Sequence, residues 1–232
     1  MSNEPESSKV WLPTRDAIER LKALNIEYDW RIPPKVFNIE IPNVELGKNE
    51  ILTPYFRFPG SSNYASPQQT LDLFLFALKK ELAKIKIKVT FERNTFISNP
   101  TNIGLANPDH NSGIFGLMKF NFMNSIAREE IELSCLIEQK EILPPVFHSA
   151  AETILTMLIH INWVKNMGLK DFPNPIMAGY IFKRGNWKDI YYPCAYYCRY
   201  NHCLEFDEIL SNVIVLGFAI NTYEPVGKEI RY

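Results

Sequence analysis

Glycine is scarce in this sequence, and the glycine-based motifs that mark several large enzyme classes are missing. Only 10 of the 232 residues are glycine. Phosphate- and dinucleotide-binding loops need glycine where the backbone must approach the ligand. Neither G-x-G-x-x-G nor G-x-x-x-x-G-K-[ST] occurs, and G-x-S-x-G and H-E-x-x-H are also absent. The four enzyme classes that these motifs mark therefore lose support.

Long apolar runs and an excess of charge of one sign are missing as well. No apolar stretch approaches the roughly 18 residues of a membrane helix. The N-terminal MSNEPESSK has neither the basic nor the apolar region of a secretory signal. With only four cysteines, we therefore expect reduced thiols in a cytoplasmic or otherwise intracellular protein that is not secreted. The formal net charge of -1 does not indicate a global attraction to nucleic acid.

The composition is that of a globular protein, with 46% hydrophobic and 22% charged residues. We expect a disordered tail over residues 1–10 and a single domain over residues 11–232. Within this domain, residues 11–65 form a Pro-rich N-terminal region. Aromatic side chains such as Trp30 and Phe37 are too numerous there for a solvated tether, so this region should pack on the core.

Hydrophobic periodicity predicts two main helices, over residues 66–84 and 144–168, and a shorter helix over 12–25. Both main helices begin with a capping-box pattern, and Gly168 suits the left-handed position after the second one. Strands are predicted by alternating apolar and polar positions at 36–42, 85–93, 114–122 and 129–142, with a hairpin at 177–192. Residues 204–220 are predicted to form a helix and then a strand. The central order α-β-β-β-α-β predicts the α+β class, with one mixed or antiparallel sheet packed by the two main helices.

An acidic residue in the loop PDHNSG and an E-x-K in the strand predicted at 129–142 are the first candidate site. These residues are Asp109, Glu138 and Lys140. Their spacing and the element order resemble the PD-(D/E)xK nuclease superfamily. The resemblance implies that Asp109 and Glu138 bind Mg²⁺ as a cofactor and that Lys140 positions the attacking water. The alternative is that Glu138 and Lys140 lie on the solvated face of an amphipathic strand.

The stretch CAYYCRYNHC is a candidate zinc site, with Cys194, Cys198, His202 and Cys203 as ligands. On a helix, Cys194, Cys198 and His202 would share one face, but Cys194 and His202 would lie roughly 12 Å apart, too far for one zinc ion. In a turn the four residues could converge, or Cys135 and His148 could supply further ligands. The alternative is a set of thiols packed among tyrosines. His160 lies within an apolar helix and is interpreted as a core histidine.

A row of basic residues along the strand predicted at 85–93 is a third candidate. Lys84, Lys86, Lys88 and Arg93 could contact single-stranded nucleic acid together with nearby aromatic residues. A solvated strand face would show the same pattern.

Taken together, these features favour a non-catalytic protein that binds another protein or assembles with itself, without a cofactor and without a membrane. The alternatives are a Mg²⁺-dependent nuclease and a nucleic-acid-binding module without catalysis. The partner and the oligomeric state stay open.

Overall fold

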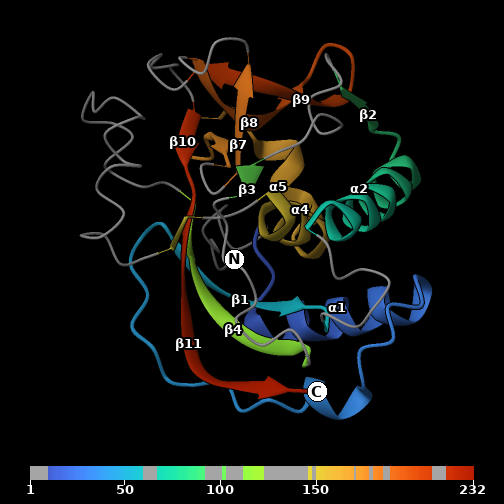
Figure 1. Cartoon of the computed structure of the whole chain (residues 1–232), viewed down its shortest axis with the longest axis vertical. Coiled ribbons are helices and arrows are strands. Elements are labelled where there is room, and N and C mark those ends of the chain that lie inside the picture. The colour runs from blue at the N-terminus through green and yellow to red at the C-terminus, as the bar shows by residue number, and fades with distance from the viewer. Residues whose placement is uncertain are drawn as a thin grey trace, which may run out of the picture.

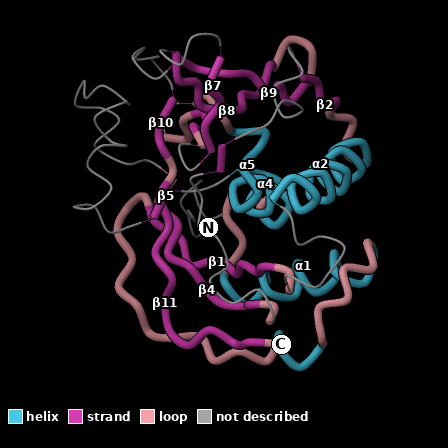
Figure 2. Tube along the Cα trace, viewed as in Figure 1, coloured by secondary structure: helices cyan, strands magenta, loops and turns pink. Residues whose placement is uncertain are grey.

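The protein belongs to the α+β class, as the element order predicts, and its strands form two sheets (Figures 1 and 2). The computed structural model describes residues 10–59, 67–91, 101–102, 112–122, 146–147, 150–169, 171–177, 180–184, 189–210 and 218–232. The helices are α1 (Thr14–Glu27), α2 (Pro67–Lys84), α4 (Ala150–Ile159) and α5 (Ile161–Asn166), with a 3-10 helix, η2 (Pro34–Phe37). The strands are β1 (Glu50–Arg57), β2 (Lys88–Phe91), β3 (Thr101–Asn102), β4 (Ile114–Asn121), β5 (Val146–Phe147), β6 (Asn174–Ile176), β7 (Tyr180–Arg184), β8 (Asp189–Cys198), β9 (Cys203–Leu210), β10 (Phe218–Ile220) and β11 (Thr222–Arg231).

The first sheet has the strand order β1-β4-β11-β5 and is antiparallel throughout. β4 lies at its centre, with β1 paired along one side and β11 along the other. β5 meets β11 only at Thr222 and Tyr223, so its contact with β11 is short. Figure 1 shows β11 as a long curved strand at the border of this sheet.

The second sheet is mixed and is organised around β8. On one side β8 pairs antiparallel with β9, ending at the directly opposed residues Cys198 and Cys203. On its other side lie β7 and β6. β2 joins β9 and β10 joins β6, both in parallel, and β3 pairs with β7. The antiparallel pairing of β7 with β8 confirms the hairpin predicted at 177–192.

Helices connect the two sheets, because α4 packs on both β1 and α2 while α5 packs on β8 (Figure 1). α1 covers β1 and also contacts α4. A single cluster of buried apolar side chains runs through these elements, with Leu21 in α1, Phe74 in α2, Phe115 in β4, Trp163 in α5 and Phe206 in β9. None of the helices in the described part of the chain combines the length and apolar character that a membrane span requires.

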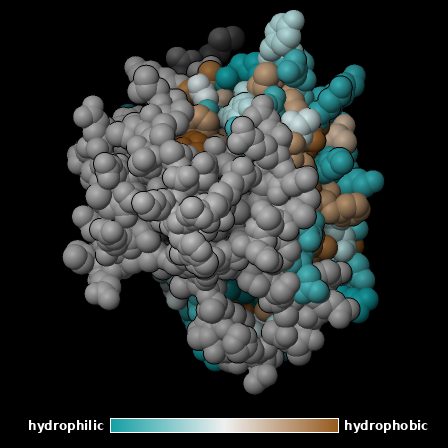
Figure 3. Space-filling model, turned by 45° about the horizontal axis from the view of Figure 1, so that its top comes forward, coloured by the Kyte–Doolittle hydropathy of each residue, from teal (hydrophilic) through white to brown (hydrophobic). Residues whose placement is uncertain are grey.

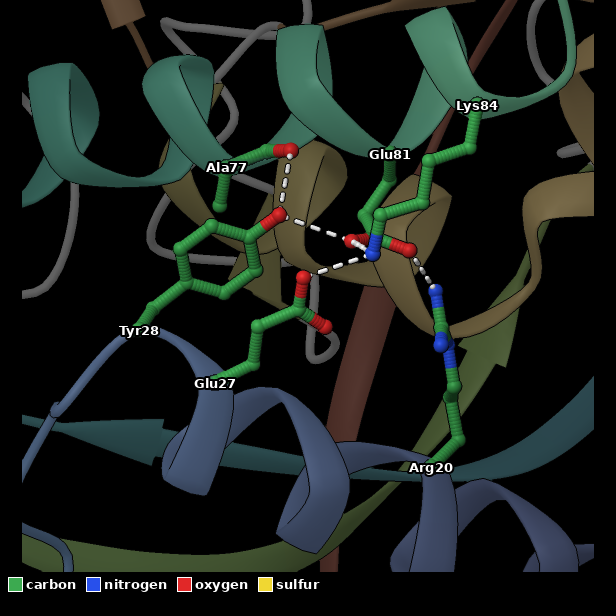
Figure 4. Close-up of polar contacts among 6 residues, drawn as sticks. All are labelled: Arg20, Glu27, Tyr28, Ala77, Glu81 and Lys84. Carbon is green, nitrogen blue, oxygen red and sulfur yellow. Dashed lines mark hydrogen bonds and ion pairs between the residues drawn. The ribbon is translucent and has the colours of Figure 1, made fainter.

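A polar cluster fastens α1 to α2 (Figure 4). The Glu81 carboxylate is only 4% exposed, and it accepts hydrogen bonds from Arg20 (2.5 Å), Lys84 (2.5 Å) and Tyr28 (2.7 Å). Lys84 also pairs with Glu27 at 2.6 Å. Burial alone would raise the pKa of Glu81, but the hydrogen bonds from these three neighbours outweigh it and lower the pKa to about 2. The carboxylate is therefore ionised at neutral pH.

Several elements differ from the sequence prediction. The helix predicted over 144–168 is broken at His160, which has φ -104° and ψ 61°, into α4 and α5. Gly168 does take the predicted left-handed conformation, with φ +76°. The helix predicted from residue 204 is wrong, because these residues continue β9. The strand predicted at 36–42 is also wrong, since residues 36 and 37 belong to η2 and residues 38–42 form a loop that pairs with no described strand. The predicted strand at 85–93 begins later, at Lys88.

Candidate functional site

An open groove lies between the loop segment 38–42 and the C-terminal half of β11. It encloses about 790 Å³. One wall is formed by Asn38, Ile39, Glu40 and Pro42, and the other by the five residues from Gly227 to Arg231. Two segments that are distant in the sequence thus form a single surface feature of the sheet border.

β11 is irregular where it forms one wall of the groove. The pairing of β11 with β4 is interrupted by a register shift between Val226 and Ile230. Gly227, inside this irregularity, has φ +73°, a left-handed conformation that L-residues other than glycine rarely adopt. A Cβ atom on Gly227 would lie 3.3 Å from Cγ of Pro42, so the walls touch at this point. Glycine therefore permits both the bend and the close approach at one end of the groove.

Among the described residues, the outer edge of β11 has little strand pairing along this groove. β5 covers it only at Thr222 and Tyr223. Both walls belong to the described residues, and no backbone hydrogen bond joins them. An edge strand of this kind presents backbone N–H and C=O groups that another extended chain can pair with.

Glu229 in the groove wall is held by a buried tyrosine from β1. The Tyr55 hydroxyl donates a hydrogen bond to Oε1 of Glu229, and the Tyr55 ring is only 1% exposed. Burial, and next the hydrogen bond with Glu229, raises the pKa of Tyr55. The ring lies against Gly116, where a Cβ atom would approach its Cε1 to 3.0 Å. The glycine in β4 thus makes room for the tyrosine that positions this carboxylate.

Charges of both signs line the groove. Glu40 and Lys228 are exposed on opposite walls, and neither makes an ion pair with another described residue. Ile39 and Ile230 are half-buried and supply apolar surface. The groove therefore offers a strand edge, apolar contact and charges of both signs.

The thiols of the CAYYCRYNHC stretch lie on the hairpin of β8 and β9. Cys194 and Cys203 are buried, whereas Cys198 is half-buried. Cys198 and Cys203 face each other across the ladder, while Cys194 is paired with Asp207 further along β8. His202 lies in the turn, where its Nδ1 is 3.0 Å from the Tyr197 hydroxyl. No group of three or more His, Cys, Asp or Glu side chains within the described ranges is arranged to hold a metal ion.

The basic residues predicted to contact nucleic acid have different surroundings. Lys84 is engaged in the α1–α2 polar cluster. Lys86 and Lys88 are exposed, and the Lys88 N–H donates to the His202 carbonyl at 3.0 Å, beside the β8–β9 turn. Figure 3 brings this end of the molecule forward, and its described residues mix hydrophilic with apolar surface. Arg93 lies outside the described residues.

The nuclease-like residues Asp109, Glu138 and Lys140 also lie outside the described residues, as do Cys135 and His148. The metal site that the resemblance implies therefore stays a prediction.

His160 is a buried core histidine. Its ring is 1% exposed, and Nδ1 accepts a hydrogen bond from the Leu12 N–H at 3.1 Å. The proton is therefore on Nε2, which donates to Thr53 Oγ1 at 2.9 Å. Burial lowers the pKa of His160 to about 3, so the ring is neutral and its nitrogens are occupied.

No family model, no curated protein and no solved structure matches this chain. Its function must therefore be inferred from its own geometry. The sequence did not predict the groove, although the EPVGK stretch combines a proline and a glycine in a way that is typical of irregular or edge strands.

Proposed function

We propose that the chain is a non-catalytic protein-binding protein, and that its groove takes an extended segment of the partner. The observation that supports this proposal is the outer edge of β11, which the short strand β5 covers only as far as Tyr223. Extended peptides often bind by adding a strand to such an edge, where backbone hydrogen bonds give affinity and side-chain contacts give specificity.

The size of the groove suits a short segment. Five residues of β11 line it, and at about 3.4 Å per residue they span roughly 14 Å. An extended peptide of about five residues would fill this length. Because it would bury less than about 1,200 Å², the complex should be weak and transient. The opposite charges of Glu40 and Lys228 favour a partner segment that carries both signs.

A peptide library tests this proposal. We expect the purified chain to enrich related extended sequences from a random library of displayed peptides. Synthetic versions should bind the wild-type chain but bind the double variant Glu40→Lys, Lys228→Glu at least about ten-fold more weakly, a change of about 1.4 kcal/mol. The matched control is Glu45→Lys, Lys48→Glu, which makes the same exchanges at exposed positions outside the groove lining. Equal binding to both double variants would refute the groove as the site.

Self-assembly is the second form of the proposal, with the β11 edge of another copy as the occupant. Size-exclusion chromatography with light scattering distinguishes the two forms. A monomer at high protein concentration would contradict self-assembly and leave only binding to a different protein.

Nucleic-acid binding is a second candidate, favoured by the exposed Lys86 and Lys88 beside the β8–β9 turn, which carries Arg199 and the 95% exposed Tyr200. Basic and aromatic side chains together suit single strands. We expect binding of a single-stranded oligonucleotide that weakens steeply with salt and with Lys86→Glu, Lys88→Glu. Binding that is absent or independent of salt would contradict nucleic-acid binding. The lysines would then be explained as charges that keep an edge strand from pairing with another chain.

The nuclease alternative needs Mg²⁺- or Mn²⁺-dependent cleavage of DNA or RNA that both Glu138→Ala and Lys140→Ala abolish. Absence of cleavage across varied substrates would count against it.

A further inference from the structure

Two thiols face each other at the end of the β8–β9 hairpin. Cys198 is the last residue of β8, Cys203 is the first residue of β9, and the two are directly opposed in the antiparallel ladder. Both are free thiols in the structure. Residues that are directly opposed in this way project their side chains from the same face of the sheet.

The spacing of these residues suits a disulfide. Opposed residues of an antiparallel pair have Cα atoms about 4.5 or about 5.5 Å apart, depending on the hydrogen-bonding pattern. Both values fall within the roughly 4.4–6.8 Å found for disulfides. Cys194 lies four residues before Cys198 on the same strand, roughly 13 Å away at 3.3 Å per residue, and is too distant to compete.

The turn between the thiols is anchored on both sides, so the two strand ends are held in register. Arg199 Nη2 donates to the Met167 carbonyl at 2.8 Å, which ties the turn to the end of α5. On the other side, the His202 carbonyl accepts a hydrogen bond of 3.0 Å from the backbone N–H of Lys88, the first residue of β2. The thiols therefore need only side-chain rotation to meet.

The two thiols differ in accessibility. Cys198 is half-buried, whereas Cys203 is 4% exposed and its Sγ lies 3.1 Å from Thr90 Oγ1. An incoming reagent therefore reaches Cys198 first. Lys88 is the neighbour of Cys203 in the parallel pairing with β2, and its positive charge favours an anionic reagent.

We propose that Cys198 and Cys203 form a redox-active pair that is oxidised by an anionic low-molecular-weight disulfide such as oxidised glutathione. The Cys198 thiolate attacks one sulfur of that disulfide, forms a mixed disulfide and releases one glutathione thiolate. The Cys203 thiolate then attacks the Cys198 sulfur, closes the intramolecular disulfide and releases the second glutathione. The two protein thiol protons pass to the two released thiolates, and two electrons move from the protein to the reagent.

Peptide mapping of the full chain tests the proposal, with oxidised glutathione as the probe. Trypsin cuts after Arg199, so Cys198 and Cys203 fall in separate peptides. We expect oxidation to remove two hydrogen atoms from the intact mass and to link these two peptides, with dithiothreitol reversing both changes. If the two peptides of the wild-type protein stay unlinked, or if the protein only gains glutathione, the proposal is overturned. This outcome is read on the wild-type protein and does not depend on the folding of a variant.

Three serine variants assign the link. Cys194→Ser is the matched control, because Cys194 shares a tryptic peptide with Cys198 and should leave the link intact. Cys198→Ser should abolish it. Cys203→Ser should instead accumulate a stable mixed disulfide between Cys198 and glutathione. A link that persists in Cys198→Ser and disappears in Cys194→Ser would place the reactive thiol elsewhere and contradict the assignment.

Discussion

Glu81 is a charged side chain that is almost completely buried, and three neighbouring side chains donate hydrogen bonds to its carboxylate. Its folded pKa of about 2 lies below the ordinary 4.5. The cluster therefore contributes its full stability above about pH 4.5, and this contribution is lost as the pH falls toward 2.

Replacing this carboxylate should show the same pH window. We expect Glu81→Gln to lower the free energy of unfolding by about 1–3 kcal/mol at pH 7, since it removes charge-assisted hydrogen bonds. The difference from wild type should shrink below about pH 4.5, as urea unfolding at several pH values can show. The exposed carboxylate control, Glu19→Gln, should change stability by less than about 0.5 kcal/mol. If the difference in the free energy of unfolding between wild type and Glu81→Gln stays constant down to pH 2.5, the low pKa of Glu81 is contradicted.

His160 should produce a separate pH dependence. Its folded pKa of about 3 lies below the ordinary 6.5, so only the unfolded chain takes up this proton as the pH falls from 6.5. Stability should therefore decline over this range by up to about 1.4 kcal/mol per pH unit from this group. In His160→Gln the decline between pH 6.5 and 5 should be shallower. Identical slopes for the two proteins, measured by urea unfolding, would show that His160 is not held neutral.

Two strands of the first sheet, β1 and β11, contain prolines. Because proline is rare inside strands, the sequence pattern does not predict these two strands. β1 contains Pro54 and β11 contains Pro225. Proline cannot donate to a ladder and is found mainly in edge strands. β1 ends the first sheet, and beyond Tyr223 the outer edge of β11 pairs with no other described strand. The prolines agree with this rule, because β1 is an edge strand and Pro225 lies beyond the residues of β11 that pair with β5, but the sequence alone does not give the sheet order.

Elements with strong local periodicity could be predicted, and those that depend on distant residues could not. The helix α2, the strand β4 and the β7–β8 hairpin follow from local pattern alone. The break at His160 needs Leu12 and Thr53, which bind its ring nitrogens from other elements. In β9, Leu204 and Phe206 alternate with Glu205 and Asp207, but LEFDEIL fits helical spacing equally well.

The bend of β11 depends on Gly227. We expect Gly227→Val to destabilise the chain by about 1–2 kcal/mol, because a side chain at positive φ is strained and would also press on Pro42. Peptide binding in the groove should weaken in parallel. Gly47→Ala is the control, since its Cβ would meet only the flexible Glu50 side chain, and its effect should stay below about 0.5 kcal/mol. Equal urea midpoints for the two variants would contradict the role of Gly227.

At the scale of the whole molecule, the groove exists because the chain brings its N-terminal segment beside its last strand. Residues 38–42 and 227–231 are separated by nearly the full sequence, so no motif spacing could connect them. The hairpin thiols were visible as a local cluster, but their pairing required the register of β8 and β9. The candidate nuclease residues Asp109, Glu138 and Lys140 lie outside the described residues and stay a prediction.

Chemical-shift mapping of a selected peptide on the ¹⁵N-labelled chain tests the central claim most directly. If the groove binds an extended partner segment, the amide resonances that shift on titration will be those of residues 38–42 and 227–231. The Glu40→Lys, Lys228→Glu variant will shift less at the same peptide concentration. Shifts confined to other parts of the molecule, with these two segments unchanged, would contradict the groove as the binding site.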